Sequence, residues 1–262
     1  MDIFDAIILG IVQGLTEFLP VSSSGHLVMA QALLGVEESQ DIVFEVALHM
    51  ATLFAIAIFY FKRISALTVG VFTGDAATWV TVGKLVVATL PVVLLALLAR
   101  EFIEAQFNSA TFAACMLLVT GCIVWTTRYT ITKGEASEPS WRDAFLIGCA
   151  QAFAILPGIS RSGTTVAVGM ALGLTPLAAA EFSFLMGIIA MAGAAVLLLP
   201  DMNTAIPGLI ESITAGGVAA LVSGLLALVA FIWLLKSKRF YVFSWYAWSA
   251  GSAFLVWTLL LR

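Results

Sequence analysis

The side chains best suited to chemistry lie in two short polar segments, each set between apolar stretches. The first segment, residues 13–26, contains Gln13, Glu17, three serines and His26, and the second is centred on Arg161. Ionisable groups are expensive inside a lipid environment and are functional candidates there by default. A serine nucleophile also needs an adjacent base. We therefore select four candidate catalytic residues: Glu17, Ser23, His26 and Arg161.

Both polar segments have the composition of an anion-binding helix start. Each places serines and a glycine directly before an apolar run. A helix N-terminus offers free N–H groups and the positive end of the helix dipole, and Arg161 can hold a phosphate bidentately. Two such termini meeting at one point would form a pyrophosphate cradle, although serine and threonine before a helix are also ordinary N-caps. The predicted pyrophosphate-binding residues are Gln13, Ser22, Ser24, Gly25, Ser160, Ser162, Gly163, Thr164 and Thr165.

Three further ionisable residues in apolar surroundings have open roles. Glu45 and His49 are four residues apart and would share a helix face. Glu45 and Glu181 can be read as struts that anchor the polar segments, and His49 as either a functional or a packing residue. The aromatic residues near the C-terminus, Tyr246 among them, are typical of an interfacial belt.

Composition places the chain in a membrane. Of its 262 residues, 61% are apolar and only 11% are charged, whereas soluble domains carry about 25% charged residues. The net charge of −4 gives no reason to expect a nucleic-acid partner. Three cysteines without motif spacing argue against a disulfide frame or a zinc site. The acidic start does not resemble the positive region of a cleavable signal peptide.

The predicted fold is all-α and polytopic. Residues 3–34 and 143–174 each contain two short apolar arms around a polar break, and neither arm is long enough to cross a bilayer comfortably. Irregular backbone at membrane depth needs protein or a wet cavity around it. We expect two re-entrant helical hairpins, with one long kinked span per region as the alternative. The six predicted transmembrane helices cover about 44–61, 82–99, 110–127, 178–199, 215–235 and 243–261.

The chain is an internal duplication. Residues 1–133 and 139–262 form two repeats within one integrated membrane domain, and each holds one hairpin and three spans. Three is an odd number, so the second repeat must be inverted relative to the first. Inverted repeats bring their broken helices together near the midplane. Matches at an offset of 138 are Asp5 with Asp143, Gly10 with Gly148, Gln13 with Gln151, Ser22 with Ser160, Ser24 with Ser162 and Gly25 with Gly163.

The basic residues predict the orientation. Clusters around Lys62, between the two repeats and around Lys238 all fall on one side of the predicted topology. The positive-inside rule assigns that side to the cytoplasm. Both termini, and the mouth of the first hairpin, would then face outward.

Two long motifs resemble the signatures of a known family. Residues 13–26, QGLTEFLPVSSSGH, and residues 157–165, PGISRSGTT, resemble the two signatures of the bacterial undecaprenyl-pyrophosphate phosphatase family. The likeness in length and span number extends over essentially the whole chain. The resemblance implies hydrolysis of the C55 isoprenoid pyrophosphate to its monophosphate, which recycles the lipid carrier for peptidoglycan and other cell-wall polymers. It also implies a bacterial plasma (inner) membrane location, a site opening to the periplasmic side, and a link to bacitracin resistance.

The same resemblance implies roles for individual residues. It assigns the chemistry to Glu17, His26 and Arg161, supported by Ser23, Ser160 and Thr165, and a divalent cation, Mg²⁺ or Ca²⁺, as cofactor. Glu17 and Gln13 are the expected metal ligands. Many relatives carry a second glutamate where this chain has Gln13, so a mechanism that needs two carboxylates is in doubt here.

Two mechanisms and two functions stay open. The nucleophile is either Ser23, activated by His26, or a water activated by Glu17 or His26. A lipid-phosphate flippase or transporter is the alternative function, because inverted repeats with broken helices are also a transporter architecture. The partners we expect are an isoprenoid lipid pyrophosphate and the bilayer, with a homodimer left open.

Overall fold

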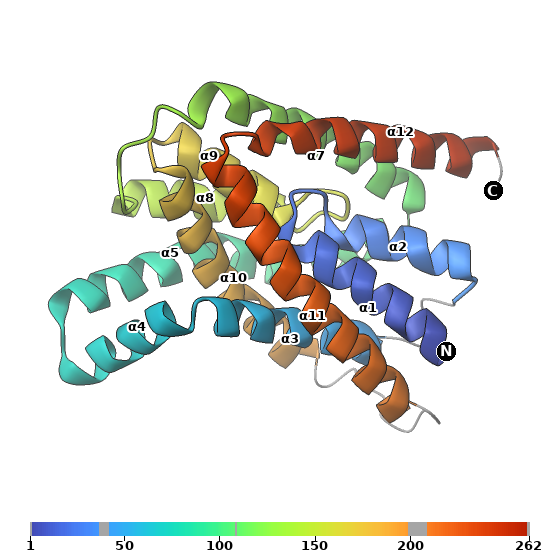
Figure 1. Cartoon of the computed structure of the whole chain (residues 1–262), viewed down its shortest axis with the longest axis horizontal. Helices are drawn as coiled ribbons and strands as arrows, with labels where there is room; N and C mark the ends of the chain where they lie inside the picture. Colours follow the sequence, from blue (N-terminus) through green and yellow to red (C-terminus); the bar gives the residue numbers. More distant parts are fainter. Residues whose placement is uncertain (1, 37–41, 108, 199–208, 261–262) are drawn as a thin grey trace.

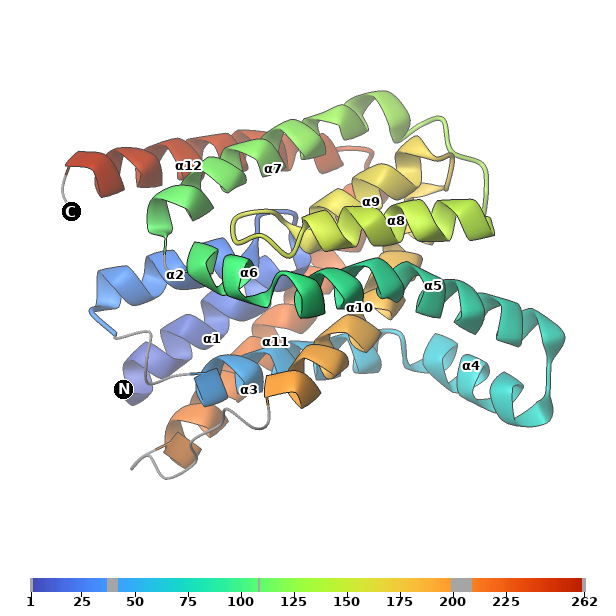
Figure 2. The ribbon, with the colours of Figure 1, turned by 180° about the vertical axis from the view of Figure 1, so that it is seen from behind.

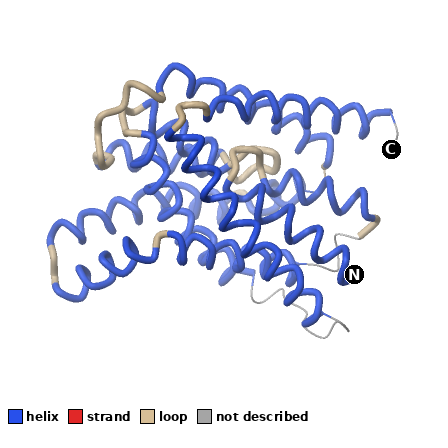
Figure 3. Tube along the Cα trace, viewed as in Figure 1, coloured by secondary structure: helices blue, strands red, loops and turns tan. Residues whose placement is uncertain are grey.

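The computed structural model describes residues 2–36, 42–107, 109–198 and 209–260. These residues fold into α-helices and one short 3-10 helix, and no strand occurs among them (Figure 3). The predicted ends of the fourth span at 199 and of the sixth at 261 lie outside the described residues. The all-helical prediction is confirmed.

Both polar breaks separate two helices that fold back on each other. α1 (Ile3–Phe18) and α2 (Ser23–Leu34) form the first hairpin, and α8 (Trp141–Phe153) and α9 (Arg161–Ala171) form the second. In Figure 1 the two hairpins approach from opposite ends of the molecule, with their connecting loops near its centre. The polar segments of the sequence are therefore the tips of the hairpins.

Long apolar helices surround the hairpins. α11 packs against α1, α5 packs on α8, and α12 runs beside α7. Figure 2 shows this arrangement from behind. The largest apolar cluster joins α10, α11 and the second hairpin through residues such as Phe184 and Phe231. The bounds are α5 Ala76–Leu98, α6 Arg100–Phe107, α7 Ala110–Thr130, α10 Pro176–Leu198, α11 Leu209–Lys236, the 3-10 helix Phe240–Val242 and α12 Phe243–Leu260.

Four of the described helices, α5, α7, α10 and α11, are long and apolar enough to cross a membrane. The first predicted span, 44–61, is instead part of a bent pair, in which α3 (Ile42–Phe59) turns by 81° into α4 (Phe61–Thr73). Counting that pair as one span gives five, compared with the six expected. The sixth predicted span corresponds to α12, which is not among these helices. Its first turns carry amphipathic residues such as Trp245 and Tyr246, which make it less apolar.

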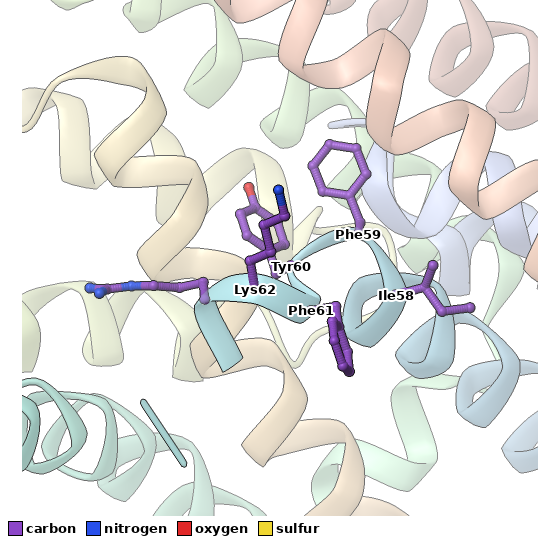
Figure 4. A pocket seen from close by; sticks show the side chains of 6 residues that line it. Ile58, Phe59, Tyr60, Phe61 and Lys62 are labelled. Atoms are coloured by element: carbon purple, nitrogen blue, oxygen red, sulfur yellow. The ribbon is translucent and has the colours of Figure 1, made fainter. Parts of the chain in front are cut away.

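The corner between α3 and α4 was not predicted. Its residues 58–63 line a surface pocket of about 440 Å³, where Tyr60 and Lys62 point to the same side and Phe61 points away (Figure 4). The bend brings Arg63 to Glu181 on α10, with Nε donating to Oε1 at 2.8 Å. Glu138, three residues before α8, adds ion pairs to Arg63 at 3.9 Å and Lys84 at 3.5 Å. This network joins α4, α5 and α10 to the segment before α8, and the role of Glu181 as an anchor of the second hairpin stays a prediction.

Candidate active site

An ion pair between the two hairpins forms the centre of the site. Arg161, the first residue of α9, donates from Nη2 to Oε1 of Glu17 on α1 at 2.6 Å, although 144 residues separate the two. Glu17 is 8% exposed, and the Arg161 side chain is 17% exposed. A buried charge needs a partner and further hydrogen bonds, because the cost of desolvating an isolated ion is large. The pairing therefore fixes the two hairpin tips against each other.

The second carboxylate oxygen of Glu17 gathers the other polar groups of the first repeat. Ser23 donates to Oε2 from Oγ at 2.7 Å, and Gln13 donates to it from Nε2 at 3.1 Å. His49 on α3 lies with Nε2 3.9 Å from the same oxygen. Glu17 is thus placed to accept the proton of Ser23. Glu17 and Ser23, six residues apart in sequence, meet because the break turns α2 back towards α1.

Several buried polar atoms at the hairpins have no hydrogen-bond partner within the described part of the chain. Two of these atoms are Nη1 of Arg161 and Oε1 of Gln13. The same side chains bind Glu17 through Nη2 of Arg161 and Nε2 of Gln13. Buried polar groups are normally satisfied, so these unpaired atoms next to an ion pair are candidate partners for a water, an ion or a phosphate oxygen. The complete set is Gln13 Oε1, Gln151 Nε2 and Oε1, Arg161 Nη1 and Thr164 Oγ1.

The local fold explains why both tips are fixed. Ser22 caps α2 with its backbone in the left-handed region at φ 68°, a conformation that costs energy for any residue but glycine. At the other tip, Thr120 on α7 accepts from the Ser160 backbone N–H at 2.9 Å and donates to the Gly158 carbonyl at 2.7 Å. Each break is therefore held by specific hydrogen bonds.

The predicted phosphate-binding residues divide into two groups. Several are used in the framework: Ser160 caps Gly163 N–H at 3.1 Å, Ser162 donates to the Leu19 carbonyl at 3.4 Å, and Thr165 bonds to Ser183 at 2.6 Å. Ser22 likewise accepts from Gly25 N–H at 3.4 Å and contacts Ser24 at 3.3 Å. Gln13 and Thr164 retain free polar atoms. Ser22 and Ser160 thus act as N-caps, as the alternative interpretation expected. The residues that keep an unpaired polar atom for a phosphate are Arg161, Gln13 and Thr164.

His26 faces a different direction from the one expected. Its Nδ1 lies 2.8 Å from the Ser22 carbonyl and its Nε2 lies 2.9 Å from the hydroxyl of Tyr246 on α12. Both ring nitrogens are therefore occupied, and the hydroxyl of Ser23 is bonded to Glu17. The expected activation of Ser23 by His26 does not match this geometry, because the base next to Ser23 is the carboxylate.

Sequence reasoning missed three contributors. Tyr246, Thr120 and Ser183 come from α12, α7 and α10, far from either motif. A tyrosine, a threonine and a serine in apolar helices carry no spacing signal of their own, so nothing in the sequence marks them. The i,i+4 pair of Glu45 and His49 did mark the side of α3 that faces the first hairpin. There Gln31 donates to Glu45 at 2.7 Å, while His49 approaches Glu17.

The donor set is chemically suited to a divalent cation that would share its coordination with substrate phosphates. Glu17 offers a carboxylate, and Gln13 offers a buried carbonyl oxygen that lacks a partner. Among the described residues no three His, Cys, Asp or Glu side chains are grouped closely enough to hold an ion by themselves. Mg²⁺ typically binds through one or two protein oxygens together with substrate phosphates and water, so this small set is sufficient.

Comparison with known proteins decides the family. The family described as bacitracin resistance protein BacA matches residues 6–253, which include the tips of both hairpins and the Glu17–Arg161 pair. The chain belongs to the BacA family. The match extends over nearly all of the described helices.

Individual BacA relatives agree in name. A protein of Desulforapulum autotrophicum is 36% identical, over 96% of this chain and 96% of its own length. One of Alkaliphilus metalliredigens is 37% identical over 99% of this chain and all of its own length. One of Methanobrevibacter smithii is 39% identical over 96% of both chains. Each of the three is named undecaprenyl-diphosphatase.

Proposed function

We propose that this chain hydrolyses undecaprenyl diphosphate to undecaprenyl phosphate and inorganic phosphate. BacA membership and the shared name of its relatives support this function over a flippase or transporter. The observation that carries it is the hydroxyl of Ser23 bonded to a carboxylate that is itself paired with Arg161. A nucleophile, its base and a phosphate-binding cation are thereby brought together at one buried point.

The first step uses Arg161 to hold the terminal phosphate. Nη1 of Arg161 is buried and lacks a partner among the described residues, so it can donate to a phosphate oxygen while Nη2 stays on Glu17. Ser23 Oγ attacks the terminal phosphorus, and its proton passes to Glu17 Oε2, 2.7 Å away. The anhydride P–O bond breaks, and the lipid monophosphate leaves with the bonding electrons.

The second step returns Ser23 to its starting state. A water attacks the phosphorus of the phosphoserine, the Ser23 Oγ–P bond breaks, and inorganic phosphate is released. Ser23 recovers one proton and the water loses one, so the step needs a proton acceptor and a donor. Glu17, protonated in the first step, is the donor. The acceptor is the neutral imidazole of His26, which takes the hydroxyl proton of Tyr246 at Nε2, 2.9 Å away, while that hydroxyl takes a proton from the water. A divalent cation held by Glu17 and Gln13 would offset charge on the phosphate oxygens.

The membrane setting follows the same proposal. The apolar helices beside the hairpins would take the isoprenoid tail, and the chain would lie in the bacterial plasma membrane with its site and both termini on the outer side. A homodimer is compatible with this arrangement. Cysteine labelling of Asp2→Cys in intact cells tests the orientation: a membrane-impermeant reagent must reach it from outside.

Phosphate release by purified protein in detergent tests the function, because detergent has no compartments for transport. The intact chain should release phosphate from an isoprenyl diphosphate, and Arg161→Ala should abolish the release. Tight lipid binding without release would support the flippase instead. Ser23→Ala separates the two nucleophiles. Near-normal turnover of that variant would show that water attacks directly. Trapping of the parent protein with a phosphate on Ser23 would show that Ser23 is the nucleophile.

A further inference from the structure

The last helix contributes a hydrogen bond to the active site. Tyr246 on α12 places its hydroxyl 2.9 Å from Nε2 of His26, 220 residues away in sequence. The two rings also stack, with centroids 5.7 Å apart and planes inclined by 13°. A tyrosine that served only as an interfacial anchor would direct its hydroxyl to water and not to a ring nitrogen. The contact therefore links α12 to the first hairpin specifically.

The other nitrogen of His26 determines which atom donates. Nδ1 lies 2.8 Å from the Ser22 carbonyl, and a carbonyl can only accept, so Nδ1 carries a proton. In the neutral imidazole Nε2 is then a bare acceptor, and the Tyr246 hydroxyl donates to it. Ser22 is the residue with the left-handed backbone, so its carbonyl direction is fixed by the hairpin break. His26 is held at both nitrogens.

The position of Tyr246 is itself well anchored. Trp248, two residues later, donates its indole N–H to the Leu118 carbonyl of α7 at 3.2 Å. Trp125 of α7 packs against Trp245 and Trp248 with ring centroids 5.6 Å from each. Apolar contacts among Val28, Ala110 and Phe254 join α2, α7 and α12 further along. These contacts set the rotation of α12 so that Tyr246 faces α2.

We propose that Tyr246 is a positioning residue that keeps His26 neutral in the Nδ1–H form, because its hydroxyl donates to the Nε2 lone pair and directs it. It acts through His26 and not on the substrate, so it makes α12 part of the catalytic machinery. The inference rests on the proposed function only for the role of His26 in turnover. The hydrogen bond and the tautomer are properties of the free protein.

A double-mutant cycle tests the catalytic part. Tyr246→Phe removes one hydroxyl and keeps the stacked ring, and we expect kcat to fall about three- to tenfold with little change in KM. In a His26→Gln background the same change should have no further effect, because residues that act through one contact are not additive. Tyr241→Phe is the matched control and should keep full turnover. Equal losses in both backgrounds would overturn the proposal.

Nitrogen-15 spectroscopy tests the structural part without any turnover. The chain has only two histidines, so a His49→Gln variant reports on His26 alone. We expect one protonated Nδ1 and one unprotonated, hydrogen-bonded Nε2, and a clear shift of the Nε2 signal in Tyr246→Phe. A protonated Nε2, or a signal that Tyr246→Phe leaves unchanged, would refute the contact. If the purified chain released no phosphate while these signals were as expected, the proposed function would fail and the contact would stand.

Discussion

A single methyl group at Gly14 should test whether helix packing sets the catalytic geometry. Gly14 lies on α1 between the site residues Gln13 and Glu17, and it faces α11 where the two helices pack together. A Cβ at this position would lie 2.4 Å from the Ala220 carbonyl oxygen, 2.8 Å from the Gly224 nitrogen and 2.0 Å from Ser223 Oγ. Two of these three atoms are backbone and cannot rotate away. α1 must therefore move.

The size of the movement follows from those distances. Ordinary van der Waals contact requires about 3.4 Å, so α1 must shift by about 1 Å away from α11. Overpacking of this kind typically destabilises a protein by about 1–3 kcal/mol. A displacement of about 1 Å at a catalytic group can cost about 10²-fold in rate. We expect Gly14→Ala to remain folded and to lose about 100-fold of its phosphate release, because Glu17 moves away from Ser23 and Arg161.

The assay is phosphate release from an isoprenyl diphosphate in detergent, normalised to folded protein by a thermal melt. Gly217→Ala on α11 is the matched control. A Cβ there meets only the Ala51 methyl, at 3.9 Å, so this variant should melt and turn over as the parent does. If Gly14→Ala released phosphate at a rate within about twofold of the parent, the claim that the α1–α11 contact sets the position of Glu17 would be wrong.

Further predictions concern the charged groups around the site. His49→Gln should change phosphate release by no more than about fivefold, because Nε2 of His49 is 3.9 Å from Glu17 and its side chain is 35% exposed; a collapse in rate would make His49 catalytic. Arg161→Lys should lose at least about 100-fold, since an ammonium cannot bind the carboxylate and a phosphate through one planar group, and near-normal rates would contradict this. Glu181→Gln should lower the melting temperature by a few degrees, the effect of losing one half-exposed ion pair, and leave turnover intact. EDTA should stop phosphate release and Mg²⁺ or Ca²⁺ should restore it; release unaffected by EDTA would remove the cation from the proposal.

The helical content and the two breaks were predictable because their signals are local. An apolar run ends near Pro20 or Pro157, and the serines that follow cap the next helix, so the sequence indicates the breaks and the starts of α2 and α9. The closeness of Glu17 and Arg161 agrees with the prediction that the two polar segments meet at one point, although their direct ion pair was not predicted.

The bend between α3 and α4 and the hydrogen-bond partners of Ser23 and His26 were not predictable. No proline or glycine marks Tyr60, where α3 turns into α4, and the corner is instead packed by rings such as Phe184 at 6.0 Å. The choice of Glu17 over His26 as the partner of Ser23 depends on which way each side chain turns from the break. That direction is set by tertiary packing, including a tyrosine on the last helix.

The two hairpin tips align in sequence but carry different chemistry. At the offset of 138 that aligns Ser22 with Ser160, Ser23 corresponds to Arg161 and His26 corresponds to Thr164. Two carboxylate-bearing tips would place like charges together in a buried centre and leave an anionic substrate without a cation. Two arginine tips would bury cations without a counter-charge. One tip with Glu17 and one with Arg161 neutralise each other at 2.6 Å and still leave Nη1 of Arg161 for a phosphate. The electrostatics of a buried centre therefore favour unlike tips, with the proposed nucleophile and base in the first hairpin and the proposed phosphate-holding cation in the second.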